Sequence, residues 1–98
     1  MTQKEQSILI VDDKPANLFA LEQTLSTLGV RIVKAENGND ALARTLEHEF
    51  ALCILDVQMP DLSGFQVAEI LRGDPKTKYT PIICLIAAGH VPLLAQRG

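Results

Sequence analysis

Two apolar runs of the sequence end in carboxylates: residues 8–11 are followed by Asp12 and Asp13, and residues 52–55 by Asp56. Runs of four or five apolar residues are typical of strands buried on both faces of a parallel sheet. If the two strands are parallel neighbours, their carboxyl ends bring the three aspartates together, and like charges then raise each other's pKa unless a cation offsets them. Hard oxygen ligands suit Mg²⁺, which also tends to bind phosphate oxygens. The three residues therefore indicate metal-assisted phosphoryl chemistry.

Strand-like and helix-like segments alternate along the rest of the chain. We expect strands at 7–11, 30–35, 51–55 (the most buried) and 81–86, a helix from Pro15 that stops before Gly29, helices at 40–49 and 65–71, and a turn at 36–39. The residues expected to face inward from the helices are Leu18, Leu21, Leu25, Leu28, Ala41, Leu42, Thr45, Leu46, Val67, Ala68, Ile70 and Leu71.

This alternation predicts an α/β fold. Three successive strand–helix units imply right-handed crossovers and a parallel sheet with helices on both faces. In such doubly wound sheets, ligands bind beyond the carboxyl ends of the strands, at the switch point between the first and third strands. The aspartates of the two apolar runs fall at that point.

Composition narrows the function classes. The 98 residues allow one domain, 47% of them are hydrophobic, and the net charge of −3 gives no basic surface for nucleic acid or an anionic membrane. No segment has the length of a membrane span or a signal peptide, so we expect a cytoplasmic protein. Cys53 and Cys84 lie inside apolar runs and are interpreted as packing residues.

Several polar residues have simpler structural interpretations beside the functional ones. Asp12 alone could cap the helix that starts at Pro15, and Asn17 is better explained as a helix-surface or capping side chain than as a ligand. The simplest interpretation of Gly64 is that the backbone at the start of the following helix requires a glycine. The side chains expected to be solvated at the surface are Lys14, Arg72, His48 and His90.

Taken together, Asp12-Asp13, Asp56, Met59-Pro60 and Gly64 resemble the receiver domain of bacterial two-component response regulators. The resemblance covers residues 7 to about 90. It implies a polar tail at 1–6 and a receiver domain at 7–98, with a flavodoxin-like three-layer sandwich of strand order 2-1-3-4 whose fifth strand and last helix are missing. A haloacid-dehalogenase-like hydrolase is disfavoured because that family's two acidic residues stand two positions apart.

The resemblance also implies roles for individual residues. Asp56 would be the phosphoacceptor, taking a phosphoryl group from a histidine kinase or phosphotransfer protein. Asp13 would bind Mg²⁺ directly, Asp12 would hold metal-bound water or assist, and the backbone carbonyl of Gln58 would supply another ligand. The domain would be a signalling module, with at most Mg²⁺-dependent self-phosphorylation and dephosphorylation.

Two departures from the family pattern leave an alternative open. Ile86 stands where receivers carry a Ser or Thr whose hydroxyl binds a phosphoryl oxygen, and the Lys that ends the fifth strand has no counterpart. The alternative is therefore a phosphorylation-impaired module that acts through protein–protein association.

The fourth strand is expected to form a bare edge of the sheet. An unpaired apolar edge is a template for association with another chain. If these residues are the whole molecule, we expect a homo-oligomer in which strand 81–86 or the tail 91–98 is covered by a second copy.

Overall fold

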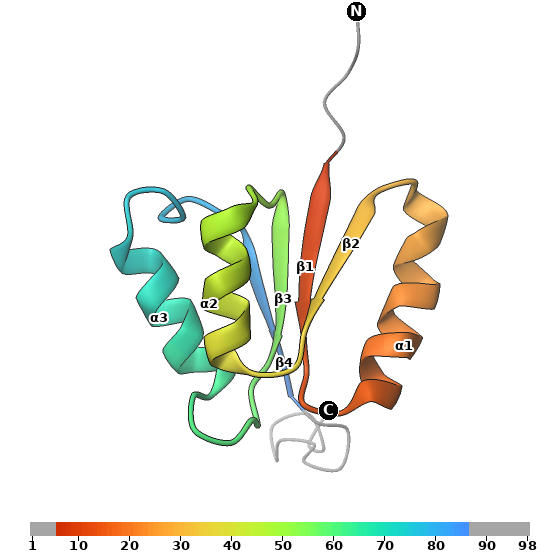
Figure 1. Ribbon diagram of the computed structural model, residues 1–98, viewed down its shortest axis with the longest axis horizontal. Coiled ribbons are helices and arrows are strands. Elements are labelled where there is room, and N and C mark those ends of the chain that lie inside the picture. Colours follow the sequence, from red (N-terminus) through yellow and green to blue (C-terminus); the bar gives the residue numbers. More distant parts are fainter. Residues whose placement is uncertain (1–5, 87–98) are drawn as a thin grey trace, which may run out of the picture.

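The computed structural model describes residues 6–86, which form a four-stranded sheet with three α-helices and a short 3₁₀ helix (Figure 1). The elements in chain order are β1 (Ser7–Val11), α1 (Pro15–Leu25), η1 (Ser26–Leu28), β2 (Arg31–Ala35), α2 (Gly38–Glu47), β3 (Leu52–Asp56), α3 (Gly64–Gly73) and β4 (Ile82–Leu85). The expectations for 87–98, among them His90 and the tail 91–98, lie outside the described residues.

All strands of the sheet are parallel, in the order β2-β1-β3-β4. Val11, the last residue of β1, pairs with Ala35 of β2 and with Leu55 of β3, so the carboxyl ends of these strands meet at one edge. The predicted fold class and strand order are confirmed. The most buried strand is β1 and not β3 as expected, since all five residues of β1 are buried whereas Leu52 at the start of β3 is only half-buried.

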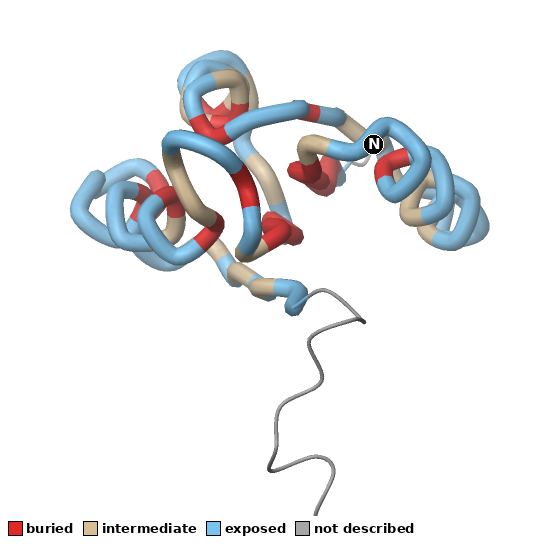
Figure 2. The backbone as a smooth tube through the Cα atoms, turned by 90° about the horizontal axis from the view of Figure 1, so that it is seen from below, coloured by how far each residue is buried: buried red, intermediate tan, exposed pale blue. Residues whose placement is uncertain are grey.

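Helices cover both faces of the sheet, with α1 on one face and α2 and α3 on the other (Figure 1). Neighbouring strand residues alternate between the two cores: Leu9 and Leu55 pack on the side of α2 and α3, whereas Ile10 and Ile54 pack on the side of α1 with Leu18. Figure 2 shows the buried residues along the strands and on parts of the helices, whose remaining backbone is largely exposed. Burial on both faces explains why β1 and β3 are uninterrupted apolar runs.

Helix α1 begins at Pro15 as predicted, and Gly29 follows its end with a left-handed φ of 70°. Its last turn tightens into η1. The 3₁₀ geometry has three residues per turn, so it breaks the periodicity that predicted an inward Leu28, and that side chain is 61% exposed.

Helix α2 begins at Gly38, two residues before the predicted start, so the predicted turn at 36–39 is partly wrong. Asn37 caps the helix, and its side-chain oxygen accepts a hydrogen bond of 2.7 Å from the backbone N–H of Asp40. Such a cap supplies a partner to an N–H group that otherwise has none in the first turn. The inward face is formed by Ala41 and Thr45, and Leu46 points outward with 72% of its surface exposed.

Helix α3 extends from Gly64 to Gly73, beyond both predicted ends. Ser63 and Gln66 form a reciprocal capping box at its start, in which each side chain accepts a hydrogen bond from the other residue's backbone N–H. Val67 and Leu71 are buried as predicted, whereas Ile70 is 46% exposed, which corrects the predicted inward position.

Arg72 is not simply solvated as expected. Its Nη1 donates hydrogen bonds to the carbonyl oxygens of Lys78 (2.8 Å) and Thr80 (2.7 Å) in the connection between α3 and β4. The buried Thr77 hydroxyl in the same connection donates to the Leu71 carbonyl at 2.6 Å. The polar connection between α3 and β4 is therefore held against the end of α3.

Strand β4 is one residue shorter at each end than predicted, and within residues 6–86 it forms an edge of the sheet. Ile83 and Leu85 lie in register with Ile54 and Asp56, and both are exposed, at 47% and 37%. Among the described residues, no helix is both long and apolar enough to span a membrane.

Candidate functional site

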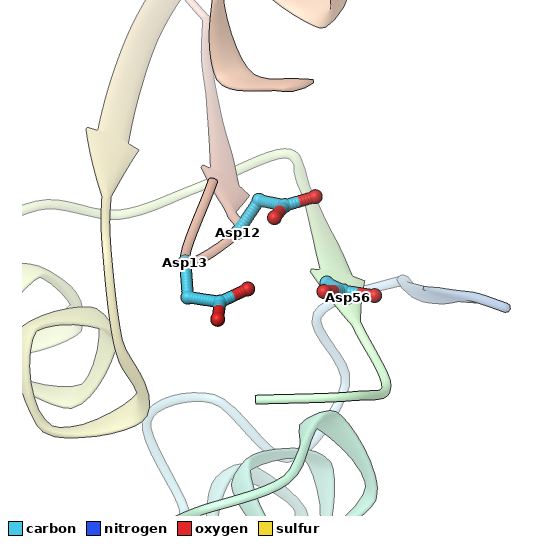
Figure 3. Close-up of side chains that lie close together, drawn as sticks. All are labelled: Asp12, Asp13 and Asp56. Atoms are coloured by element: carbon cyan, nitrogen blue, oxygen red, sulfur yellow. The ribbon is translucent and has the colours of Figure 1, made fainter. Parts of the chain in front are cut away.

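The three predicted aspartates meet at the carboxyl edge of the sheet. Asp12 and Asp13 directly follow β1, and Asp56 is the last residue of β3, the strand beside it (Figure 3). One carboxylate oxygen from each residue lies within 4.8 Å of those of the other two, and this is a group that could hold a metal ion. The predicted proximity is confirmed, and the roles assigned to the residues stay a prediction.

Asp12 is buried, and hydrogen bonds fix both of its carboxylate oxygens. Oδ1 accepts from the backbone N–H of Lys14 at 2.9 Å, and Oδ2 accepts from the side-chain amide of Asn17 at 3.1 Å. The cap position of α1 is occupied by Lys14, without a side-chain cap, so helix capping is not what Asp12 does. Asn17 is exposed on the helix as predicted, but its hydrogen bond to Asp12 was not foreseen.

Asp13 is half-buried, and its Oδ1 is withdrawn from solvent without a hydrogen-bond partner. The Lys14 ammonium lies 3.7 Å from this oxygen, and the Lys14 side chain is 63% exposed. Buried polar atoms normally have partners, so an oxygen without one fits a place for a cation. The donor set, three carboxylates within reach of one ion, suits Mg²⁺.

Asp56 is buried, with 6% of its surface exposed. Burial raises the pKa of its carboxyl, and the nearby Asp12 raises it further, while Lys14 acts in the opposite direction. One oxygen accepts a long hydrogen bond of 3.4 Å from the backbone N–H of Gln58. The carboxylates of Asp12, Asp13 and Asp56 thus bring negative charges close together, and a bound cation would stabilise their ionised forms.

The loop between β3 and α3 is held at both ends. Val57 donates its backbone N–H to the Leu85 carbonyl of β4 at 2.9 Å, and Gly64 donates to the Val57 carbonyl at 3.1 Å. Asp61 has a left-handed φ of 68°, which Asp tolerates better than most residues. Gln58, the loop residue two positions after Asp56, is exposed.

Ile86 directly follows β4, so it lies at the carboxyl ends of the strands, as the three aspartates do. It is the residue after Leu85, which pairs with Asp56, and its side chain is 54% exposed. An exposed isoleucine at the position where the resemblance expects a hydroxyl gives no hydrogen-bond donor there.

The remaining candidate ligands lie elsewhere. His48 is half-buried at the end of α2, with its ring 5.9 Å from the ring of Phe50. Cys53 is buried in β3, where desolvation raises its pKa to about 11. A buried, protonated thiol is a packing residue, as the sequence indicated. Within residues 6–86, the acidic, His or Cys residues that lie close enough together, in a group of three or more, to bind one ion are the three aspartates.

Comparison with known proteins gives these residues a family context. Residues 8–96 match the model of the response regulator receiver domain family. Protein PilH of Pseudomonas aeruginosa is 38% identical over 76 residues, which cover 78% of this chain and 63% of PilH. Probable histidine kinase 4 of Oryza sativa is 33% identical over 101 residues, and the match covers 93% of this chain but only 10% of the kinase.

A solved structure shares the fold. Response regulator protein TrrA of Thermotoga maritima, crystallised in complex with Mg²⁺-BeF, is 37% identical with a TM-score of 0.78, and the match covers 88% of this chain and 74% of TrrA. With the match to the family model, the sheet order and the aspartate cluster agree on one assignment. The chain therefore belongs to the response regulator receiver domains, the receiving modules of two-component signal transduction.

Proposed function

We propose that this domain accepts a phosphoryl group on Asp56 from a phosphohistidine of a histidine kinase or phosphotransfer protein, with Mg²⁺ bound at the aspartate cluster. The observation that carries the proposal is the convergence of Asp12, Asp13 and Asp56 within 4.8 Å of one another. Relatives such as Probable histidine kinase 4 carry a matching segment, which supports a kinase as the partner.

The transfer is a displacement at phosphorus. A carboxylate oxygen of Asp56 attacks the phosphorus atom, an O–P bond forms, and the P–N bond to the histidine ring breaks. The imidazole leaves with the bonding electron pair and takes up a proton from solvent. Little covalent chemistry is required of the protein, so positioning and charge stabilisation carry the reaction.

Three residues and one backbone group would hold the metal ion. Asp13 and Asp56 supply carboxylate oxygens, Asp12 holds metal-bound water or assists, and Gln58 contributes its backbone carbonyl. A bound Mg²⁺ supplies charge stabilisation to the transferring phosphoryl group. The unpartnered Asp13 Oδ1 supports this set, as does the Mg²⁺-BeF complex of TrrA.

A small phosphodonor tests the assignment. The intact mass of the protein incubated with phosphoramidate and Mg²⁺ should rise by one phosphoryl group, and EDTA or Asp56→Asn should abolish the gain. Asp61→Asn is the matched control, because Asp61 is an exposed carboxylate of the neighbouring loop and Asn also tolerates its left-handed φ. Absence of any mass gain in the unmodified protein would favour the phosphorylation-impaired interaction module.

The same experiment also tests whether the domain catalyses its own phosphorylation and dephosphorylation. We propose that phosphorylation from a small donor and later dephosphorylation are the domain's own Mg²⁺-dependent reactions and need no partner protein. In the second reaction water attacks the phosphorus atom, the P–O bond to Asp56 breaks, and inorganic phosphate is released. The decay of the phosphorylated mass after removal of the donor measures the second step. A cytoplasmic location stays a prediction of the sequence.

We further propose that, if these residues are the whole molecule, the edge formed by β4 is covered by a second copy of this chain. The exposed apolar side chains of Ile83 and Leu85 support this proposal. Sedimentation velocity at micromolar concentration should show a dimer or higher oligomer, and Ile83→Lys should dissociate it. A well-folded monomer at that concentration would contradict the proposal.

A further inference from the structure

We propose that Asn17 is a positioning residue for the metal site, and that it acts by fixing the carboxylate of Asp12. The proposal rests on the Mg²⁺ site proposed above and assigns a task to a residue outside the ligand set. It concerns the affinity of the site for the ion.

The contact joins α1 to the end of β1. The side-chain amide nitrogen of Asn17 donates to Asp12 Oδ2 at 3.1 Å, across five positions of the chain. Only 5% of the surface of Asp12 is exposed. A carboxylate in that setting has few alternative donors, so the amide determines how the group is oriented.

The two hydrogen bonds of Asp12 differ in kind. The bond from the Lys14 backbone N–H to Oδ1 is fixed by the main chain, and substitution of a side chain does not remove it. The bond from Asn17 to Oδ2 depends on one side chain. With both donors the carboxylate plane is fixed at two points, whereas with one it can rotate about the remaining bond.

Asn17 is not required for the helix on which it lies. Lys14 occupies the cap position of α1, and its carbonyl accepts from the backbone N–H groups of Asn17 and Leu18. The Asn17 side chain is exposed. Its substitution therefore leaves the helix start and both cores in place, so an effect on the metal site can be separated from an effect on folding.

An amide is suited to hold a ligand without competing for the ion. It is neutral and donates to the carboxylate, and an ionised carboxylate oxygen keeps a further lone pair when it accepts one hydrogen bond. Asp12 can thus bind the Asn17 amide and still present oxygen toward Asp13 and Asp56. Residues that orient metal ligands in this way typically change metal affinity 10–100-fold when mutated.

The test is a calorimetric titration of the full chain with Mg²⁺. Asn17→Leu removes the donor, keeps the side-chain size and is well tolerated in a helix. We expect its dissociation constant for Mg²⁺ to rise about tenfold, at the lower end for such residues because the Lys14 bond remains. Gln23→Leu, which removes an exposed amide elsewhere on α1, is the control and should leave the affinity unchanged.

Two further measurements exclude a merely structural role. The melting temperature of metal-free Asn17→Leu should fall by no more than about 4–8 °C, the loss that one hydrogen bond accounts for in a domain of this size, and the Asn17 side-chain amide resonances should shift when Mg²⁺ is added. In an Asp12→Asn background, Asn17→Leu should change the affinity less than twofold, because the two residues act as one unit.

The outcomes distinguish a failure of the positioning role of Asn17 from a failure of the proposed Mg²⁺ site. If the unmodified protein does not bind Mg²⁺, both fail. If the unmodified protein binds Mg²⁺ and Asn17→Leu binds equally well, only the positioning role is overturned. Equal losses in Asn17→Leu and Gln23→Leu, or a loss that accompanies a melting temperature lowered by more than one hydrogen bond accounts for, would also overturn it.

Discussion

Gly64, the first residue of α3, lies directly against the backbone carbonyl of Asp56 at the end of β3. A Cβ atom at Gly64 would overlap that carbonyl oxygen and come within 3.0 Å of the Cα atom of Val57. The start of the helix and the end of the strand thus approach each other as closely as backbones can. The contact therefore involves the backbone of the candidate phosphoacceptor itself.

Gly64→Ala should lower the free energy of unfolding by about 1–3 kcal/mol, because the methyl group meets backbone atoms that cannot rotate away. Gly73→Ala is the matched control at the other end of α3. A Cβ there meets nothing within 4 Å and Gly73 has no positive φ, so alanine should stabilise the helix or leave it unchanged. Chemical denaturation of both variants measures the difference, and equal effects would contradict the close approach at Gly64.

Asp56→Asn should raise the melting temperature at pH 7 in EDTA and low salt. The folded state raises the pKa of Asp56 above its ordinary value of 3.8, so it binds the proton more tightly than the unfolded state does. Asp56 therefore stabilises the fold less as the pH rises from 3.8 through the raised pKa, and the asparagine variant escapes that loss. An increase of a few degrees is expected, since about 1 kcal/mol corresponds to ~4–8 °C in a domain of this size.

The advantage of Asp56→Asn should shrink as the pH is lowered toward 4, because the carboxyl of the unmodified protein then becomes neutral in the folded state. Asp61→Asn, which alters an exposed carboxylate, should show no comparable gain. Thermal scans across pH 4–7 measure both variants. A gain that grows toward low pH would contradict the sign of the shift.

Ile86→Thr should strengthen the binding of beryllofluoride in the presence of Mg²⁺. The new hydroxyl stands at the end of β4, beside the strand that carries Asp56, and can donate to a phosphoryl-like fluorine or oxygen. A hydrogen bond to a charged group contributes about 1.5–3 kcal/mol, so the gain should be roughly tenfold or more. Because Ile86 is already half exposed, the substitution costs little core packing.

Ile83→Thr is the control for this variant, because Ile83 is similarly exposed on the same strand but lies away from its carboxyl end. Calorimetric titration with beryllofluoride compares the two variants. Similar gains in both would show that the position of the hydroxyl does not matter.

Arg72→Met should loosen the connection between α3 and β4. The substitution removes the donor to the Lys78 and Thr80 carbonyls at a cost of about 1 kcal/mol, since these hydrogen bonds lie at the surface. Hydrogen exchange should speed up in residues 77–80, whereas Lys78→Met, which removes a neighbouring exposed cation, should leave exchange unchanged. Unaltered exchange in Arg72→Met would mean that Thr77 alone holds the connection.

The strands could be predicted because burial on both faces requires uninterrupted apolar runs, as in residues 8–11 and 52–55, whereas their order was implied by the resemblance to receiver domains. The convergence of Asp12, Asp13 and Asp56 followed from the same pattern, since parallel neighbours end at one edge. The inward faces of the helices were predicted less well. Leu46 and Ile70 are apolar and lie next to inward positions, yet α2 and α3 bury only narrow faces of small or branched residues such as Ala41 and Val67.

Contacts that depend on a single polar side chain were not predictable from patterns. The hydrogen bonds of Asn17 and Arg72 connect an exposed side chain to a particular oxygen, and many arrangements of the same sequence would leave both solvated. The early start of α2 had a signal, because Asn37 stands three residues before Asp40 and asparagine is a preferred cap. The glycine after it, which usually favours a turn, concealed that signal.

The position of β1 has a consequence for how the chain folds during synthesis. β1 is made first but lies between β2 and β3, so one of its edges stays open until residue 55 has left the ribosome. The interval between the ends of β2 and β3 is roughly 20 residues, or about 1–4 s at ordinary translation rates. During that time the apolar residues Ile8 to Val11 can pair with another nascent chain. The strand that positions two of the three aspartates is thus also the segment through which a stalled chain would aggregate.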